Sequence, residues 1–209
     1  ISFPRNVEHY DRYLTFEGVP KHETDAWRDS LITFCKKLTW KYGRSLLLKS
    51  PSHTARIRHL MDWFPDARFV NIHRHPHEVF LSTLHYWSTA VWFTYLQKPD
   101  RSKLDEEILQ RYRRVMDAYH EQRPLVPEER FHELTFTELE ADPMGCLERI
   151  YTQLKIPDFA ELKPTFQSYI DQQKSYRKND FTPLPKDTLD LINRYAQPEF
   201  DRWHYDRDP

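Results

Sequence analysis

Glycine is scarce in this 209-residue chain, which contains only Gly18, Gly43 and Gly145. A glycine-rich loop that cradles phosphate follows a strand and opens a helix. The nearest approximation, Gly43-Arg44-Ser45, instead precedes the residues that we expect to form a strand. We therefore expect no glycine-rich phosphate loop within this chain.

Cysteine and long apolar runs are also in short supply. Cys35 and Cys146 are the only cysteines, which is too few for the disulfide framework of a small secreted domain. No apolar run approaches the roughly 20 residues that a membrane-spanning helix needs. We therefore expect a soluble, cytoplasmic protein without a transmembrane segment.

An excess of charge of either sign is missing, because 31 basic and 32 acidic residues give a net charge of −1. The chain as a whole has no field that attracts nucleic acid or anionic lipid, so we expect no nucleic-acid partner. Any phosphate binding must depend on a local cluster of cations. The length is within the range of a single domain, and the oligomeric state cannot be read from it.

Helix and strand patterns alternate in the first half of the chain. Over 22–42, apolar residues recur at steps of three or four, which predicts an amphipathic helix that Gly43 ends. Residues 45–49 and 68–73 are short apolar runs typical of buried parallel strands, and 52–64 repeats the helical period. This order is a βαβ unit, so we predict an α/β fold whose parallel sheet is flanked by helices.

Helix patterns dominate the second half. We predict helices over 105–123 and 144–154 and a third short strand over 130–134. Thr135 is expected to cap a short helix that follows this strand, and Asp142-Pro143 to end that helix.

The most informative stretch is 65–87, where an apolar strand runs into a basic turn and then a helix. Arg74 follows the carboxyl end of the strand, and Ser82 lies about two helical turns later, where its hydroxyl can converge with the guanidinium. Open α/β sheets bind ligands at such strand ends. The pattern therefore predicts an anion site.

The pattern Arg-x-Pro followed by Ser at this spacing, with Lys-Ser-Pro-x-His upstream, resembles the sulfotransferases that use 3′-phosphoadenosine-5′-phosphosulfate (PAPS). In that family the Arg and the Ser hold the 3′-phosphate of the donor. The resemblance implies a P-loop-kinase-like fold and transfer of a sulfuryl group from PAPS to a hydroxyl or amine. It also implies a small-molecule or glycan acceptor, whose identity the sequence does not give.

Two later segments add to the resemblance. FHELTFTELEADP resembles the family's strand and Tyr-Glu-Asp-Leu turn, with Phe136 in place of Tyr beside the adenine. SYRKNDF resembles the Arg-Lys-Gly segment that closes on the 3′-phosphate, which assigns Arg177 and Lys178 to the same anion; Asn179 replaces the Gly. The alternatives are an ordinary core strand with its helix and an exposed Arg-Lys pair.

Lys49 and His53 are the candidates for the chemistry. Sulfuryl transfer needs a cation at the leaving oxygen and a base for the acceptor proton, and a lysine and a neutral imidazole suit these tasks. In cytosolic members of the family the His follows the Lys by two residues, where this chain has Pro51. The alternatives are a solvated strand end for the lysine and a backbone-bonding residue at a helix start for the histidine.

The family also has an Arg/Lys-Ser-Gly-Thr-Thr loop near its N-terminus, and no counterpart is present here. Residues 1–20 show neither helical nor strand periodicity. We therefore expect residues 1–209 to be the C-terminal two-thirds of a single sulfotransferase domain, truncated at the N-terminus and inactive alone. The alternative is a catalytically silent nucleotide-binding or scaffold module that retains only the 3′-phosphate site.

Two other interpretations concern the same region. His73, His75 and His77 alternate and could be proposed as a metal site. Pro76 interrupts the strand between them and no cysteine or paired carboxylate completes the set, so we predict no metal. The aromatic run 85–95 is expected to pack in the core or to border the acceptor pocket.

Overall fold

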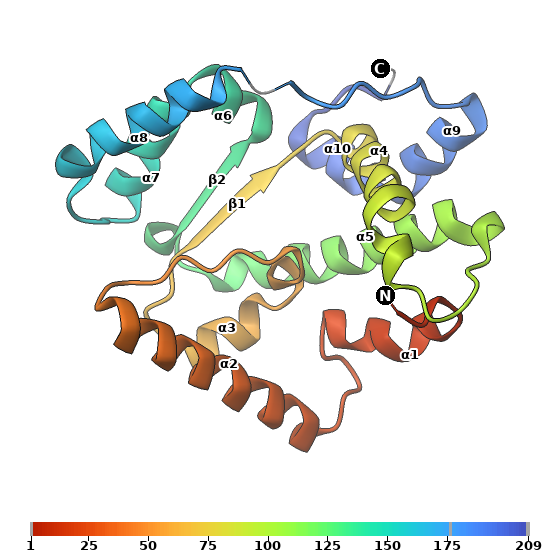
Figure 1. Cartoon of the computed structure of the whole chain (residues 1–209), viewed down its shortest axis with the longest axis horizontal. Helices are drawn as coiled ribbons and strands as arrows, with labels where there is room; N and C mark the ends of the chain where they lie inside the picture. The colour runs from red at the N-terminus through yellow and green to blue at the C-terminus, as the bar shows by residue number, and fades with distance from the viewer. Residues whose placement is uncertain (1, 176, 208–209) are drawn as a thin grey trace. The chain divides into compact units, whose positions relative to one another are not determined.

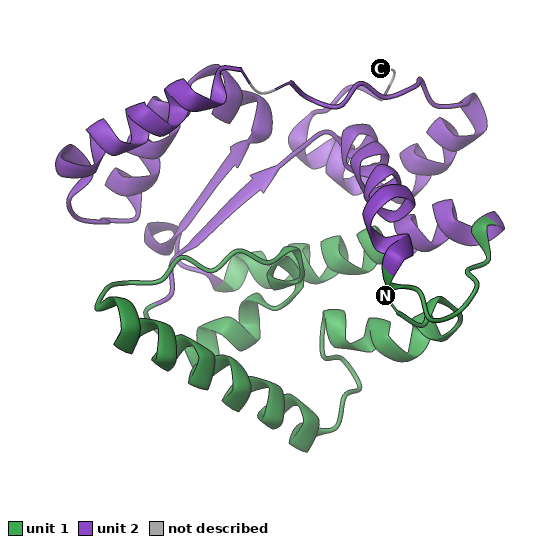
Figure 2. Cartoon of the chain, in the orientation of Figure 1, with its two compact units in different colours: residues 1–66, 94–101, 111–125 green, residues 67–93, 102–110, 126–209 purple. Residues whose placement is uncertain are grey.

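The structure is a computed structural model that describes residues 2–175 and 177–207. The chain divides into two compact units (Figure 2). Unit 1 comprises residues 1–66, 94–101 and 111–125, and unit 2 comprises 67–93, 102–110 and 126–209. Within the described residues, no helix has the length and apolar character needed to cross a membrane.

Unit 1 is built from the helices α1 (Val7–Asp11), α2 (Lys21–Tyr42) and α3 (Ile57–Trp63) and the later part of α5 (Leu104–Gln122). The predicted long helix is confirmed as α2. It ends at Gly43, which has a positive φ of 61° and donates its backbone N–H to the carbonyl of Thr39 at 2.8 Å. Glycine adopts this conformation without the steric cost of a Cβ.

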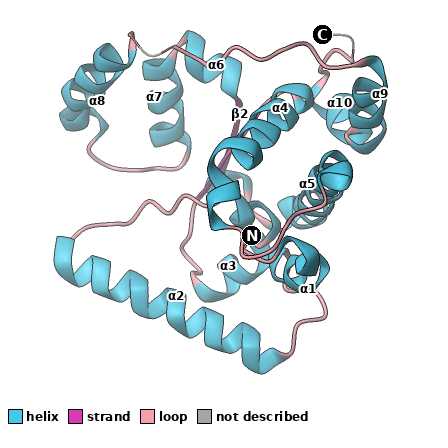
Figure 3. Cartoon of the chain, turned by 45° about the vertical axis from the view of Figure 1, so that its right-hand side comes forward, coloured by secondary structure: helices cyan, strands magenta, loops and turns pink. Residues whose placement is uncertain are grey.

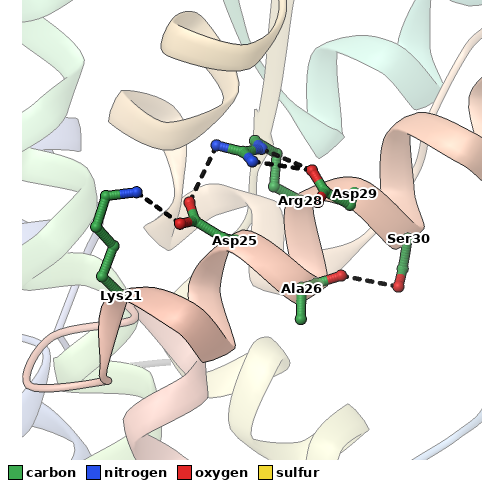
Figure 4. A network of polar contacts seen from close by, with 6 residues as sticks. All are labelled: Lys21, Asp25, Ala26, Arg28, Asp29 and Ser30. Atoms are coloured by element: carbon green, nitrogen blue, oxygen red, sulfur yellow. Dashed lines mark hydrogen bonds and ion pairs between the residues drawn. The ribbon is translucent and has the colours of Figure 1, made fainter.

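Ion pairs link successive turns near the start of α2 (Figure 4). Lys21 pairs with Asp25 one turn later, and Arg28 reaches both Asp25 and Asp29 at 3.0 and 2.9 Å. Residues three and four apart are neighbours on a helix surface, so the Lys21–Asp25 and Asp25–Arg28 pairs join adjacent turns of α2, whereas Arg28 and Asp29 are consecutive residues. Ser30 donates its hydroxyl to the carbonyl of Ala26 at 2.8 Å.

A buried arginine organises the core of unit 1. Arg56 is 8% exposed, and its guanidinium lies 4.8 Å from the ring centroid of Phe16 and 4.9 Å from that of Trp27. It also donates to the backbone carbonyls of Leu14 and Tyr13. These bonds hold the N-terminal segment against the residues that precede α3.

The N-terminal segment is not irregular, which corrects the expectation of no periodicity over 1–20. It forms α1 between the 3₁₀ turns Pro4–Asn6 and Arg12–Leu14. Arg111 of α5 contacts both carboxylate oxygens of Asp11, at 3.1 and 3.2 Å. Contacts from distant residues therefore support turns that local periodicity does not reveal.

The predicted strand over 45–49 is not formed, so its expected pairing with 68–73 is wrong. Residues 45–50 have no regular structure, and Leu47 is 93% exposed. A strand requires a neighbour that accepts and donates its backbone hydrogen bonds, and the sheet in the described part of the chain has two other strands only. The predicted helix over 52–64 is divided into the 3₁₀ helix Pro51–Ala55 and α3.

Unit 2 contains the sheet, formed by β1 (Phe69–His73) and β2 (Phe131–Thr135). The strands run parallel and side by side, and the register pairs Phe69 with Phe131 and His73 with Thr135 (Figure 1). Asn71 donates its side-chain amide to Glu133, its partner across the ladder, at 2.9 Å. The parallel sheet of an α/β fold is thus confirmed, with β1 paired to the third predicted strand.

Helices make up most of the rest of unit 2 (Figure 3). They are α4 (Pro76–Tyr86), the start of α5, α6 (Phe136–Ala141), α7 (Pro143–Gln153), α8 (Phe159–Gln173), α9 (Lys186–Tyr195) and α10 (Gln197–Trp203). Leu134 of β2 packs in a buried cluster with Cys146, Ile150 and Leu154. Among the other helices of unit 2, α4 packs against α9, and α9 packs against α10.

Candidate functional site

The ends of the two strands bring Arg74 and Phe136 together. His73 and Thr135 are partners in the parallel register, so the residues that follow them emerge at the same edge of the sheet. The Arg74 guanidinium carbon lies 4.5 Å from the centroid of the Phe136 ring. A cation within about 6 Å of a ring face is attracted by the ring quadrupole.

Thr135 fixes the position of Phe136, which is the first residue of α6. The Thr135 hydroxyl accepts a hydrogen bond from the backbone N–H of Glu138 at 3.0 Å, and the Glu138 carboxylate accepts one from the backbone N–H of Thr135 at 2.8 Å. This reciprocal pair is a capping box, and it confirms the predicted helix cap at Thr135. The backbone N–H and the hydroxyl of Thr135 both donate to the Glu138 carboxylate, and these two bonds lower the pKa of Glu138 below its usual value.

Lys178 approaches the same ring from the loop that precedes α9. Its ammonium nitrogen lies 5.5 Å from the Phe136 centroid and 2.5 Å from a carboxylate oxygen of Glu140 on α6. Glu140 and Lys178 are 38 positions apart in the sequence. This ion pair therefore joins the loop to the helix that carries Phe136.

Arg74 has a carboxylate partner of its own. Its Nε atom lies 2.5 Å from Glu78, one helical turn later at the start of α4. The Arg74 side chain is 29% exposed and that of Glu78 is 51% exposed, so both can be reached from solvent. Two cations and two carboxylates thus share the surroundings of the Phe136 ring.

For Ser82 and Arg177, the other residues assigned to the anion, the described part of the chain shows no hydrogen bond, ion pair or ring contact with Arg74, Phe136 or Lys178. Ser82 is exposed on α4, and Arg177 is exposed in the loop before Lys178. Tyr176, in the same predicted segment, lies outside the described residues. Of the residues assigned to the 3′-phosphate and the adenine, the structure joins Arg74, Phe136 and Lys178.

Lys49 and His53 belong to unit 1, whereas the cluster around Phe136 belongs to unit 2. Lys49 is exposed in the irregular segment, and His53 is half-buried in the 3₁₀ helix Pro51–Ala55. Burial, with a smaller contribution from Arg56, lowers the pKa of His53 below its ordinary value. Its Nδ1 atom is buried and makes no hydrogen bond within the described part of the chain.

The three alternating histidines hold the C-terminal segment. Tyr205 and Trp203 both contact His73: the Tyr205 hydroxyl lies 2.8 Å from Nδ1, and the Trp203 ring stacks on the imidazole at 4.1 Å. His75 donates through Nε2 to the backbone carbonyl of Asp206 at 2.8 Å, and His77 pairs with Asn193 at 2.9 Å. Among the residues that the structure describes, no group of three or more His, Cys, Asp or Glu could hold a metal ion.

Sequence reasoning missed Trp203 and Tyr205 as neighbours of the site. Burial is the largest influence on both groups: it lowers the pKa of His73 and raises the pKa of Tyr205 to about 12. The local signal would have been the Trp-x-Tyr spacing after a short helix. That signal does not say which distant residue the two rings contact.

Comparison with known proteins identifies relatives. A model of the sulfotransferase family matches residues 5–161. The omega-hydroxy-beta-dihydromenaquinone-9 sulfotransferases Stf3 of Mycobacterium bovis and Mycobacterium tuberculosis are each 31% identical to the chain over 207 residues. These alignments cover 99% of the chain and 53% of each relative, so the chain spans about half the length of the curated relatives it matches.

A solved structure has the same fold. The chain is similar to the crystal structure of sulfotransferase STF9 from Mycobacterium avium, with a TM-score of 0.63 and 21% sequence identity. The superposition covers 76% of this chain and 42% of that protein. The α/β fold with a parallel sheet is therefore shared.

Proposed function

Because the chain belongs to the sulfotransferase family, we propose that it forms the part of a sulfotransferase that holds the 3′-phosphate end of PAPS. In this proposal the whole protein transfers a sulfuryl group from PAPS to a hydroxyl or amine acceptor. Residues 1–209 belong to a single domain of that enzyme. No metal takes part.

The convergence of Arg74 and Lys178 on the Phe136 ring carries the proposal. The two cations come from segments about a hundred positions apart, and both lie within 6 Å of one ring centroid. A phosphate dianion bound there would accept charge-assisted hydrogen bonds from both. Phe136 then serves as a platform that orients the cations beside the nucleotide. Ser82 and Arg177 would join when the ligand is bound.

Lys49 and His53 are proposed to act on the reacting group. Bound PAPS supplies the sulfuryl group and a phosphate as leaving group. The lowered pKa of His53 keeps its imidazole neutral at neutral pH, which is the form that accepts a proton from an acceptor hydroxyl. Lys49 is exposed and positively charged, and suits the stabilisation of a developing negative charge.

The acceptor is proposed from the relatives. Stf3 is named for a hydroxylated dihydromenaquinone, which is a small molecule with an apolar body. By similarity, we propose a hydroxyl group on a small, largely apolar acceptor. A glycan is the alternative that an acceptor panel would test.

Nucleotide binding tests the proposal directly. Adenosine 3′,5′-bisphosphate should bind more tightly than adenosine 5′-monophosphate, because only the first has a 3′-phosphate. Arg74→Ala should remove roughly 1.5–3 kcal/mol of that affinity, the range for hydrogen bonds to a charged group. This loss corresponds to a dissociation constant about 10- to 150-fold larger in isothermal titration calorimetry.

Arg130→Ala is the matched control, because Arg130 immediately precedes β2, whereas the cluster lies beyond its carboxyl end. We expect this variant to bind both nucleotides as the wild type does. Equal affinity of the wild type for the two nucleotides would contradict the assignment of a 3′-phosphate site. A catalytically silent module would instead pass this binding test and show no transfer in a whole-length protein.

A further inference from the structure

Both cations of the proposed site are already neutralised by carboxylates of the same chain. Arg74 pairs with Glu78, and Lys178 pairs with Glu140, each at 2.5 Å. The two carboxylates lie on different helices, α4 and α6, and each contacts a different cation. Each cation of the site therefore has its own carboxylate partner, and the two partners come from separate helices.

The pairs are accessible enough to be exchanged. The side chains of Glu78 and Lys178 are 51% and 55% exposed, and those of Arg74 and Glu140 are 29% and 35% exposed. Ion pairs that are open to solvent contribute little free energy, so an incoming anion can separate them. A phosphate that accepts bonds from both cations would replace two weak pairs by stronger charge-assisted bonds.

We infer that Glu78 and Glu140 are specificity-determining residues, which hold Arg74 and Lys178 before binding and make anion affinity depend on displacing both carboxylates. This inference rests on the proposed function, because it concerns the same 3′-phosphate site. A ligand with one weak negative charge gains too little at the site to separate both pairs. A phosphate dianion at the 3′ position of a nucleotide gains enough.

Lys178 has a second role in this arrangement. The residues that follow Lys178, up to the start of α9, form no helix or strand. The pair with Glu140 therefore positions the loop beside α6 before any ligand arrives. Glu140→Gln removes the competing charge but keeps an amide oxygen that can accept a hydrogen bond from Lys178, and Glu78→Gln does the same for Arg74.

The test compares Glu78→Gln, Glu140→Gln and the double variant with the wild type in titration calorimetry at fixed salt. Each single variant should bind adenosine 3′,5′-bisphosphate about two- to fivefold more tightly, the fold-change that corresponds to one exposed ion pair. Inorganic pyrophosphate, used as a probe without adenosine, should also bind to the variants more tightly than to the wild type, by a similar factor. Adenosine 5′-monophosphate should bind to the variants and to the wild type with the same affinity, because it has no 3′-phosphate.

Glu161→Gln is the matched control, since Glu161 is an exposed carboxylate on α8 and the substitution changes the net charge equally. The inference would be overturned if Glu161→Gln raised the affinity for the bisphosphate and for pyrophosphate as much as Glu78→Gln and Glu140→Gln do. It would also be overturned if the affinity for the 5′-monophosphate rose by the same factor. Failure of the proposed function is separate: the wild type would then not prefer the bisphosphate. In that case the pyrophosphate gain still decides whether the carboxylates compete with anions at these cations.

Discussion

Burial sets the protonation state of three histidines, His53, His59 and His73. In each of them burial is the largest influence and lowers the pKa below the usual value of 6.5. Each imidazole is packed against aromatic rings, such as the Trp203 ring that stacks on His73. The folded chain therefore keeps these groups neutral at pH values where the unfolded chain protonates them.

The free energy of unfolding should consequently fall as the pH falls below about 6.5. Between the lowered pKa values and 6.5, the unfolded state binds more protons than the folded state, so stability rises with pH. We expect a smaller unfolding free energy at pH 5.5 than at pH 7.5 in urea denaturation. Four carboxylates also have lowered pKa values, and they affect the unfolding free energy at more acidic pH; they are Glu23, Asp25, Glu138 and Asp171.

His73→Gln should reduce the difference in unfolding free energy between pH 5.5 and pH 7.5, because glutamine does not titrate. An unchanged difference in His73→Gln would show that this histidine does not contribute. A difference of the opposite sign in the wild type would contradict the account of burial.

At the scale of elements, the parts of the fold that depend on neighbouring residues could be predicted from the sequence. The end of α2 at Gly43 and the cap at Thr135 are both local, and both are confirmed. The run 45–49 has the composition of a strand but lacks a neighbouring strand to pair with. Composition does not specify a partner, so this part could not be predicted.

The site shows the same division. The position of Arg74 directly after β1 could be predicted, because the strand pattern that precedes it is local. Its contact with Phe136 required knowledge that β1 pairs with β2, which are 62 positions apart in register. The carboxylates of Glu78 and Glu140 carry no motif, and their contacts with the cations emerge only from the folded geometry.

Thr135→Ala tests the element that positions Phe136. Loss of the capping hydroxyl should destabilise the chain by about 1 kcal/mol, the usual cost of replacing a helix cap by alanine. The measurement is the midpoint and slope of urea unfolding. Thr135→Ser retains the hydroxyl and should recover most of the loss; a serine variant as unstable as the alanine variant would point to lost packing rather than lost capping.

At the scale of the whole molecule, the scarcity of glycine limits what residues 1–209 can do. The chain has three glycines, and Gly18 and Gly43 occupy positive-φ positions. Neither follows a strand and opens a helix, the setting that a phosphate-cradling loop requires. The proposed anion site near Phe136 thus has no such loop within the described residues to hold a second phosphate group.

We accordingly predict that residues 1–209 alone transfer no measurable sulfate from labelled PAPS to a panel of hydroxyl and amine acceptors. Loss of one hydrogen-bond donor at a developing charge costs about a hundredfold or more in rate, and a whole loop supplies several. In a protein of the relatives' length, Lys49→Ala or His53→Ala should lower turnover and leave nucleotide affinity nearly unchanged. Turnover by the short chain, or full activity of both variants, would contradict this account.

The hydrogen bond between His73 and Tyr205 joins residues 132 positions apart, which has a consequence for biosynthesis. A ribosome adds about 5–20 residues per second, so about 7–26 seconds pass between the synthesis of the two partners. Throughout that interval the end of β1 exists without the aromatic residues that later cover His73. A nascent chain therefore cannot complete the surroundings of His73 until residues 203–205 have been made, and a chain released before Trp203 would keep this histidine uncovered.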